Sequence, residues 1–566
     1  MLSHNNRLAG LVAAAISACL CVTAAPAAAD PADAAPAATS SVPAVTQGVA
    51  RRPATFELLE LDIIGNTVLD EGLIQDTLAP FMGPGKTLAD VDKARETLES
   101  LYHDKGFKSV TVSIPRQKVK DGVVQLQVTE EKIGHLNVVG SKYHSIDKIK
   151  SAMPTVAEGS VPDWEKMRQE LLALDQQQDL SVTPSLKAGT APGTVDMDLV
   201  VDDKLPLHGM LELNNRYSQD TVHNRVIGNL SYGNLWQRGD SLSLSYQTAP
   251  QDTSTARILF GNYLATFGES PFSLLLSGLH TTSNVTTLGS ITVLGEGHSY
   301  GAQGIWKLPD TKTSASELTT SITYKSFNTA LDVGGVPTTT PLVYYPISLG
   351  YTRYGQREGD SNQFDVSMNF ADSRRGTPTQ ALIDGADCST CPSLDHSHFG
   401  ARSNMFYLRS DYSWTHDLPA HLQSYVHLNG QLTDEPLVSN EQISGGGMDT
   451  ARGYLEAEAI GDEGIESTLE LRGPTLPDLI SNVSFDRHVQ DLRPFIFLDQ
   501  VWLRMHGPFP DNESATATRL RSTGLGINMN LFEALHGVFD LSRPLVDGPH
   551  TKAGQDRVSF RVWVTF

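Results

Sequence analysis

The sequence predicts a mainly β protein, in which a 16-stranded antiparallel transmembrane β-barrel follows two small α+β domains. The chain has 566 residues, more than one hydrophobic core usually supports, so several domains are expected. From about residue 205 onward, short segments alternate apolar and polar side chains with a period of two. Before them, a weak repeat places Gly65 and Gly140 at matching points, 75 residues apart.

The first 29 residues predict a secretory signal peptide. Arg7 supplies a positive charge, residues 8–22 form an apolar core, and an Ala-x-Ala site precedes Asp30. A lipoprotein signal ending before Cys19 is the alternative, but the apolar run continues past that cysteine. Residues 30–54 are rich in alanine and proline, which predicts a flexible tether.

Residues 55–131 and 132–204 predict two domains that share the order β-α-α-β-β. In the first domain, Thr87 is expected to cap a helix whose core-facing residues are Val91, Ala94, Leu98 and Leu101. The corresponding face of the second domain consists of Trp164, Met167, Leu171 and Leu174. The acidic pair Asp202 and Asp203 is expected to be solvated at the end of a strand.

Residues 205–566 predict the barrel. Sixteen alternating segments are expected between 208 and 566; one of them sets Leu242, Leu244 and Tyr246 against Ser241, Ser243 and Ser245. A β-sandwich would also alternate, so the connections decide the question. Short turns alternate with long loops, such as those expected at 328–341 and 371–402. This pattern is typical of an outer-membrane barrel, apolar outside and polar around a water-filled lumen.

Composition excludes several classes of protein. After the signal there is no apolar run long enough for a transmembrane helix. The net charge of −22 argues against a nucleic-acid partner, which would need a basic face. The chain has no nucleophile elbow, phosphate-binding loop or dinucleotide fingerprint. We therefore expect neither an enzyme nor a cofactor.

Arg452 stands in a glycine-rich stretch, residues 445–464, between the expected strands 11 and 12. It could be a solvated arginine in a surface loop. On a later strand, however, Asp499 shares a face with Phe497 and Val501, where a carboxylate needs a cationic partner. If the loop folds into the lumen, Arg452 and Asp499 can form a charge-assisted pair.

These features resemble the two-partner-secretion outer-membrane transporters of the ShlB/FhaC/HecB-like haemolysin secretion/activation family (TpsB). The loop motif of that family is matched by Arg452, Gly453, Tyr454, Gly461, Asp462 and Gly464. Its strand motif is matched by Phe497 and Asp499, and the two repeats resemble its periplasmic POTRA domains. The resemblance implies that the loop enters the lumen and that Arg452 pairs with Asp499. It also implies that the terminal Phe566 is read by the barrel-insertion machinery.

Three features depart from the family pattern. Val501 replaces the usual glycine of the strand motif, and Glu131 stands where a glycine is common. Prolines at positions 31, 36, 43 and 53 make the tether a poor plug helix. We therefore expect a resting state without a plug.

A cluster of Cys388, Cys391, His396 and His398 lies in one long loop. Outside the cytoplasm, a Cys-x-x-Cys pair most simply forms a small disulfide, which is our expectation for Cys388 and Cys391. Zinc binding by all four residues is a less favoured alternative, and free thiols are the third.

The resemblance implies a translocase that binds an unfolded haemolysin or adhesin in the periplasm and exports it to the cell surface. The implied partners are this exoprotein, outer-membrane lipid and, during biogenesis, periplasmic chaperones and the barrel-assembly machinery. A monomer is expected. The alternatives are a factor that inserts other barrels into the membrane and a passive pore, which would leave the periplasmic repeats unexplained.

Overall fold

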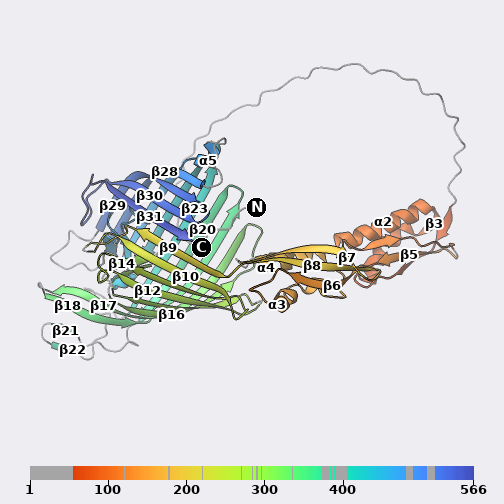
Figure 1. Cartoon of the computed structure of the whole chain (residues 1–566), viewed down its shortest axis with the longest axis horizontal. Helices are drawn as coiled ribbons and strands as arrows, with labels where there is room; N and C mark the ends of the chain where they lie inside the picture. Colours follow the sequence, from red (N-terminus) through yellow and green to blue (C-terminus); the bar gives the residue numbers. More distant parts are fainter. Residues whose placement is uncertain are drawn as a thin grey trace, which may run out of the picture. The chain divides into compact units, whose positions relative to one another are not determined.

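The structure is a computed structural model that describes residues 55–566, except 120, 176–178, 220, 269, 283–284, 289–290, 295, 334–335, 373–380, 384–385, 389–403, 480–488 and 507–516. The described chain divides into two compact units, one ending at Pro206 and the other spanning Leu207–Phe566. The first unit contains two modules, and the second is a β-barrel (Figure 1). Within the described ranges, no helix is both long and apolar enough to span a membrane.

The first module packs two helices against a sheet with the strand order β2-β5-β4. Thr87 stands at the N-cap of its longer helix, as expected, and its backbone N–H donates to Asp90 at 2.9 Å. Val91, Ala94 and Leu98 are buried in the core. The elements are β1 (Phe56–Leu58), β2 (Glu60–Ile64), α1 (Glu71–Leu78), η1 (Ala79–Phe81), β3 (Gly83–Lys86), α2 (Leu88–Asp104), β4 (Thr111–Ser113) and β5 (Val123–Thr129).

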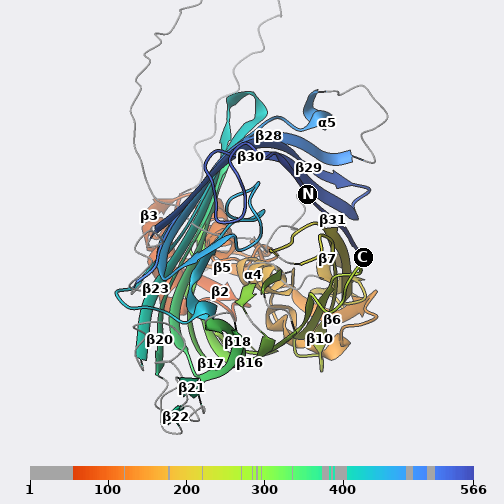
Figure 2. The same ribbon diagram turned by 90° about the vertical axis from the view of Figure 1, so that its left-hand side faces the viewer.

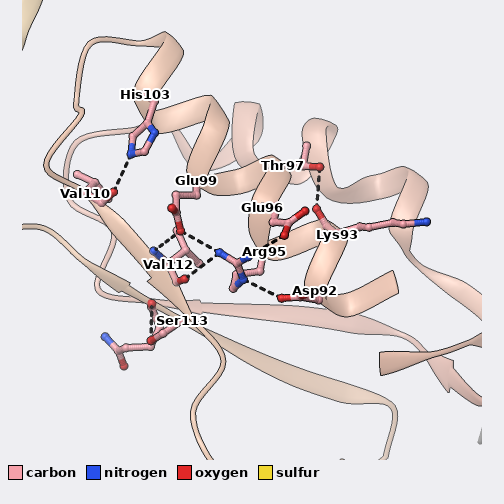
Figure 3. Close-up of polar contacts among 11 residues, drawn as sticks. Asp92, Lys93, Arg95, Glu96, Thr97, Glu99, His103, Val110, Val112 and Ser113 are labelled. Atoms are coloured by element: carbon pink, nitrogen blue, oxygen red, sulfur yellow. Dashed lines mark hydrogen bonds and ion pairs between the residues drawn. The ribbon is translucent and has the colours of Figure 1, made fainter. Parts of the chain in front are cut away.

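Polar contacts join α2 to the edge strand β4 (Figure 3). Glu99 accepts the backbone N–H of Val112 at 3.1 Å and the guanidinium of Arg95 at 3.0 Å. His103 Nε2 lies 3.0 Å from the carbonyl oxygen of Val110. Side chains of α2 therefore bond the N–H of Val112 and the carbonyl of Val110, backbone groups at the β4 edge of the sheet.

The second module repeats this design with a sheet of order β6-β8-β7. Its core contains Met167 and Leu174, with Trp164 and Leu171 packed against it. The elements are β6 (Lys132–Val139), α3 (Ile146–Ser151), η2 (Pro154–Val156), α4 (Trp164–Asp175), β7 (Leu180–Ala188) and β8 (Thr194–Asp203).

The repeated glycines occupy equivalent turns. Gly65 and Gly140 have φ angles of +96° and +100°, a region that side chains with a Cβ rarely adopt. A Cβ there would lie 2.4 Å from the carbonyl oxygen of Val128 and 2.3 Å from that of Val201, respectively. The chain therefore needs glycine at both positions, for the φ angle and for the close approach.

Asp203 corrects one expectation, because it is buried rather than solvated. Its carboxylate accepts the backbone N–H groups of Lys142, Tyr143 and His144 at 2.5, 2.6 and 2.9 Å. Burial alone would raise the pKa of Asp203, but the hydrogen bonds from His144 and its neighbours outweigh burial and lower the pKa to about 2. In the first module, Glu130 accepts the backbone N–H of Thr67 at 2.7 Å in the same way. Each module thus fixes the turn after its glycine with a carboxylate.

The second unit is a closed antiparallel barrel. Strands β18 and β19 both pair with β17 and are separated only by Tyr345 and Pro346, so they count as one of 16 strands. The barrel strands are β9 (Leu207–Asn214), β10 (Arg225–Leu235), β11 (Asp240–Thr248), β12 (Arg257–Thr266), β13 (Phe272–Thr281), β16 (Glu296–Lys307), β17 (Ser314–Val333), β18 (Val336–Tyr344), β19 (Ile347–Arg357), β20 (Asp360–Asp372), β23 (Asn404–Leu418), β24 (Leu422–Leu432), β27 (Glu463–Arg472), β28 (Val489–Arg504), β29 (Ala517–Leu531), β30 (Leu535–Pro544) and β31 (Arg557–Thr565).

The prediction of a long loop at 328–341 is wrong. There, β17 continues to Val333 and β18 starts at Val336, so this connection is a strand hairpin that extends beyond the rest of the barrel. The glycines and prolines of the segment suggested a loop, but proline is tolerated at a sheet edge. The loop expected at 371–402 begins only after β20 ends at Asp372, and it contains β21 (Ala381–Ile383) and β22 (Ala386–Cys388).

Apolar side chains cover the outside of the barrel, as the alternation predicts. On β11, Leu242, Leu244 and Tyr246 are exposed. Ser245, between them, faces inward, where Asn229 of β10 donates a hydrogen bond to its hydroxyl at 2.6 Å. The fold class is therefore confirmed: a mainly β chain with a 16-stranded barrel after two α+β modules.

Candidate functional site in the barrel lumen

Residues 433–462 connect β24 to β27, the eleventh and twelfth barrel strands, and we call them the lumen loop. Two short strands, β25 (Ile443–Gly445) and β26 (Ala459–Gly461), pair with each other and shape the loop as a hairpin. Figure 2 shows the barrel strands as a ring. Side chains of the lumen loop bond to inward-facing residues of the barrel strands.

Arg452 lies at the tip of the lumen loop and is bound to Asp499 on β28. Its backbone N–H, Nε and Nη2 all donate to the Asp499 carboxylate, at 3.0, 2.9 and 2.8 Å. Both residues are buried, and the Asp499 side chain is almost completely shielded from solvent. A forked guanidinium–carboxylate pair with an added backbone bond fixes both the position and the orientation of the tip.

Two further groups complete the environment of Arg452. Its Nη1 donates to Glu470 of β27 at 2.7 Å, and Glu470 also pairs with Arg472 at 2.9 Å. The guanidinium lies over the ring of Phe497, with 3.5 Å between its carbon and the ring centroid. Two cations and two carboxylates therefore balance in charge, and an aromatic face covers the central arginine.

Glu470 was not predicted from the sequence. It stands directly opposite Phe497 in the register of β27 and β28, on the inward-facing set of β27 that includes Glu466 and Thr468. The signal that could have found it is this inward placement of a carboxylate beside the strand motif, where an unpaired charge would be costly.

Tyr454 and Gly453 follow Arg452 and attach the tip to the last strands of the barrel. The Tyr454 hydroxyl donates to the carbonyl of Val546 at 2.7 Å and accepts the N–H of Arg521 at 3.3 Å. Gly453 has a φ of +92° and lies against Pro544. The tyrosine ring is buried with Leu520 in a small apolar cluster.

Asp462 closes the base of the lumen loop. One carboxylate oxygen accepts the N–H of Leu437 at 2.8 Å and the side-chain amide of Gln442 at 2.9 Å; the other accepts the N–H of His506 at 2.6 Å. The flanking Gly461 and Gly464 pack so closely on β28 that a Cβ at either would lie 2.9 or 2.6 Å from Leu503 side-chain atoms. These three motif residues hold the start of β27 to the loop base.

Val501, the residue that departs from the family's strand motif, is buried against Gly445 of the lumen loop. A Cβ at Gly445 would lie 2.5 Å from a methyl carbon of Val501. The space that a glycine usually leaves on the strand is therefore provided here by a glycine on the loop. The other unusual residue, Glu131, lies between β5 and β6.

Three acidic residues of the loop escaped the sequence reading. Glu441 is buried and accepts the hydroxyls of Tyr344 and Tyr407, both at 2.6 Å. Glu456 and Glu458 bond to residues outside the loop, Arg216 and Thr551 respectively. Their spacing of two residues gave no signal, because their partners lie far away in the sequence.

Of the remaining residues predicted from the sequence, only Phe566 is described with its side chain. Phe566 pairs with Gly209 of β9 through two backbone hydrogen bonds, at 2.9 and 3.0 Å. Cys388 ends β22, and its side chain is not described. Cys391, His396 and His398, as well as the signal peptide and the tether, lie outside the described residues.

Comparison with known proteins identifies two matching family models. The model described as haemolysin secretion/activation protein ShlB/FhaC/HecB matches residues 193–529. The model of the ShlB-type POTRA domain matches residues 56–131. The first model covers more than half of the chain and includes the whole lumen loop.

Similar proteins agree with this assignment. The heme/hemopexin transporter protein HuxB of Haemophilus influenzae (strain 86-028NP) is 19% identical over 422 residues, covering 72% of this chain and 71% of the relative. The outer membrane transporter CdiB of Dickeya dadantii (strain 3937) is 21% identical over 440 residues, covering 76% and 75%.

Solved structures support the fold. CdiB from Escherichia coli has a TM-score of 0.60 at 17% identity and covers 92% of this chain and 93% of its own. BamA from Haemophilus ducreyi lacking POTRA domains 1–3 has a TM-score of 0.52 at 13% identity, with 90% and 100% covered. The chain belongs to the ShlB/FhaC/HecB haemolysin secretion/activation family, the outer-membrane transporters of two-partner secretion, which export a secreted partner protein.

Proposed function

We propose that this protein exports an unfolded exoprotein of the haemolysin or adhesin type through the lumen of its own barrel. The observation that carries the proposal is the asymmetric placement of the lumen loop. Arg452 holds the tip to Asp499 and Glu470 on β28 and β27. On β11, by contrast, the inward-facing Ser243 and Ser245 are small and uncharged. A polypeptide can pass along such a wall without breaking ion pairs.

The two modules before the barrel are proposed to receive the exoprotein in the periplasm. In the first module, β2 is an edge strand of the sheet β2-β5-β4, and in the second, β7 is an edge strand of β6-β8-β7. An extended segment can add to such an edge through main-chain hydrogen bonds, which are indifferent to sequence. The modules would thereby keep the exoprotein unfolded and direct it to the lumen.

Directionality is proposed to come from folding of the exoprotein outside the cell, because the chain contains no nucleotide-binding motif. The apolar outer surface of the barrel is its lipid contact, and Phe566 is the residue that the barrel-assembly machinery reads during insertion. Periplasmic chaperones would deliver the unfolded barrel. A monomer suffices, since the ring closes with its own strands.

Arg452 and Asp499 are proposed to hold the lumen loop in its working position. If either partner is removed, the other remains as an uncompensated buried charge, at a cost of about 3–5 kcal/mol. The loop then loses its fixed position, although the barrel wall keeps its own strand pairing.

Deletion of the gene tests the proposed function directly. The secreted, surface and outer-membrane proteomes of the deletion strain are compared with those of the parent strain. Loss of one or two very large exported proteins, with other barrels unchanged, is the expected result and identifies the cargo. A broad decrease of many barrel proteins would instead indicate an assembly factor. Unchanged proteomes would indicate a passive pore.

A further inference from the structure

We infer that Glu456 and Glu458 bind the lumen loop to both sides of the strand pair at which the barrel closes, so that loop docking and barrel closure stabilise each other. Neither residue belongs to the loop and strand motifs. The inference concerns the closure of the barrel itself and does not depend on which substrate the barrel carries.

Glu456 binds the first side. Arg216, two residues after the end of β9, donates from Nε and Nη2 to the two oxygens of the Glu456 carboxylate, at 3.0 and 3.1 Å. Both side chains are only 7% exposed. The backbone N–H of Glu456 also donates to the carbonyl of Tyr217 at 3.1 Å, and Asp449 of the loop supports Arg216 with a second ion pair of 2.6 Å. The loop thus contacts the chain just beyond β9 through both side chain and backbone.

Glu458 binds the second side. One of its oxygens accepts the backbone N–H groups of His550 and Thr551, both at 2.7 Å, and the other accepts the Thr551 hydroxyl at 2.9 Å. These residues belong to the connection from β30 to β31. The same connection receives the Tyr454 hydroxyl at Val546. Glu458 is buried. Within the loop it accepts only the N–H of Leu455, at 3.1 Å, so most of the hydrogen bonds to its charge depend on this connection staying in place.

The strand pair between these two anchors, β9 with β31, closes the barrel. The register of β31 with β9 runs over five residue pairs, from Arg561 opposite Asn214 to Thr565 opposite Met210. Backbone hydrogen bonds of Gly209 with Phe566 and of Asn215 with Phe560 continue it at the two ends. The neighbouring pairs β9–β10 and β30–β31 each have eight residue pairs in register. Across the closing pair, Glu212 and Arg561 form an inward-facing ion pair of 2.8 Å. No short connection joins β9 to β31, whereas 215–224 link β9 to β10 and 545–556 link β30 to β31. Bonds from outside the ladder therefore contribute more to the stability of the closing pair.

The geometry makes the two anchors interdependent. Glu456 and Glu458 are separated only by Ala457, whose φ of +50° turns the chain between them. Each carboxylate accepts one N–H within the loop, from Met448 or Leu455. All their other bonds form together only if the loop tip is docked and the chain beyond β9 lies at its native distance from the β30–β31 connection. Thermodynamic linkage then requires that docking of the loop favours closure by the same free energy with which closure favours docking.

The test uses the purified full-length protein and measures the temperature at which the folded barrel loses its resistance to SDS. Glu456→Gln and Glu458→Gln are compared with Glu533→Gln, which alters an exposed glutamate in the β29–β30 turn. Each variant is also made with a disulfide across the closing pair, by Leu213→Cys with Val562→Cys, which are in register. A control disulfide joins β13 to β16, by Leu276→Cys with Ala302→Cys. The disulfide versions carry Cys388→Ser and Cys391→Ser.

We expect E456Q and E458Q each to lower this temperature by about 3–6 °C, with no change for E533Q. When each variant is measured against a parent that carries the same disulfide, the deficit should disappear with the closing-pair disulfide and persist with the control disulfide. Three results would overturn the inference: no deficit in either variant, a deficit that persists with the closing-pair disulfide, or a deficit that both disulfides remove equally.

Discussion

The two inner walls of the barrel differ in the chemistry that they present to the lumen. On β27 and β28, the inward-facing residues include Glu466 and Asp499, which are buried, and Glu470, whose side chain is 8% exposed. All three bond to the lumen loop or to a neighbouring side chain. On β11 and the middle of β10, the inward-facing Ser243, Ser245 and Asn229 are uncharged, and Asn229 donates to both serine hydroxyls. The charged Arg225 stands only at the start of β10.

This difference indicates which strands hold the lumen loop in one position and which strands are suited to contact a moving polypeptide. A buried ion pair confines a loop to one geometry, because any displacement exposes an unpaired charge to a poorly solvating environment. Neutral hydroxyls and amides can exchange hydrogen bonds with water or with a passing backbone at little net cost. The wall formed by β27 and β28, which we call the charged wall, is thus suited to hold the lumen loop. The wall formed by β11 and the middle of β10, which we call the neutral wall, is suited to accommodate a chain of varying sequence.

The largest effect is expected when the charged wall loses its central cation. Arg452→Ala leaves Asp499 and Glu470 without their shared partner and costs about 3–5 kcal/mol of loop docking. Secretion of the partner protein should fall to near background, while the amount of folded barrel in the outer membrane stays normal. Quantitative immunoblots of culture supernatant and membranes measure both.

The matched control for this prediction is Arg543→Ala. Arg543 also forms a forked pair with an aspartate, Asp556, at 2.6 and 2.7 Å, but both side chains are about half exposed. Water solvates either charge if the other is removed, so secretion should not change. Equal losses in the two variants would show that burial on the charged wall is not what matters.

A smaller effect is expected from crowding the contact between the loop and the charged wall. Gly445→Val places new atoms within 2.5 Å of Val501, so the loop base must shift and secretion should fall several-fold. Adding Val501→Gly to Gly445→Val transfers the space from one chain to the other and should restore most of the secretion. A double variant no better than the single variant would refute the close-packing explanation.

The neutral wall is tested with one charge. Ser245→Glu introduces a carboxylate on β11, whereas Ser245→Gln adds nearly the same volume without charge. We expect a moderate decrease in secretion for the glutamate variant and a smaller one for the glutamine variant. The docked lumen loop should be unaffected in both, as measured by the alkylation rate of a cysteine introduced at Thr450. Equal secretion by the two variants would show that size, not neutrality, limits passage.

The smallest effect on secretion is expected from the second module, where one carboxylate acts locally. Because the pKa of Asp203 is lowered from 3.8 to about 2 in the folded state, the ionised group stabilises the fold above about pH 4, and this contribution is lost as the pH falls toward 2. Asp203→Asn should remove on the order of 2 kcal/mol at pH 7 and flatten the pH dependence between 4 and 2. Urea unfolding of the compact unit ending at Pro206 measures both quantities, and an unchanged pH profile would contradict the assignment.

Much of the fold could be predicted because its signals are local. The two-residue alternation located the barrel strands, and the capping Thr87 located a helix start. Arg452 and Asp499 were predicted to meet because each lies in a short motif that resembles the family pattern, and the structure places them in contact.

Other features could not be predicted because their partners are distant or depend on the surrounding shape. Glu456 meets Arg216 across 240 positions of sequence, a separation that periodicity does not report. Asp203 looked like a solvated strand end, yet the turn at 142–144 folds over it and buries it. Val501 looked like a crowding substitution until Gly445 was found opposite it.

The closing pair also constrains how the barrel can be assembled. The other pairings of the barrel join strands that follow one another along the chain. Ring closure instead brings together segments such as Asn215 and Val558, which are 343 residues apart. Bringing such distant segments together carries a large loop-closure entropy, so closure should be the late step of folding. Until then, β9 and β31 are both open sheet edges, which readily pair with foreign strands. A partly assembled barrel of this topology therefore needs temporary protection at two edges, and its risk of misassembly ends only when the ring is complete.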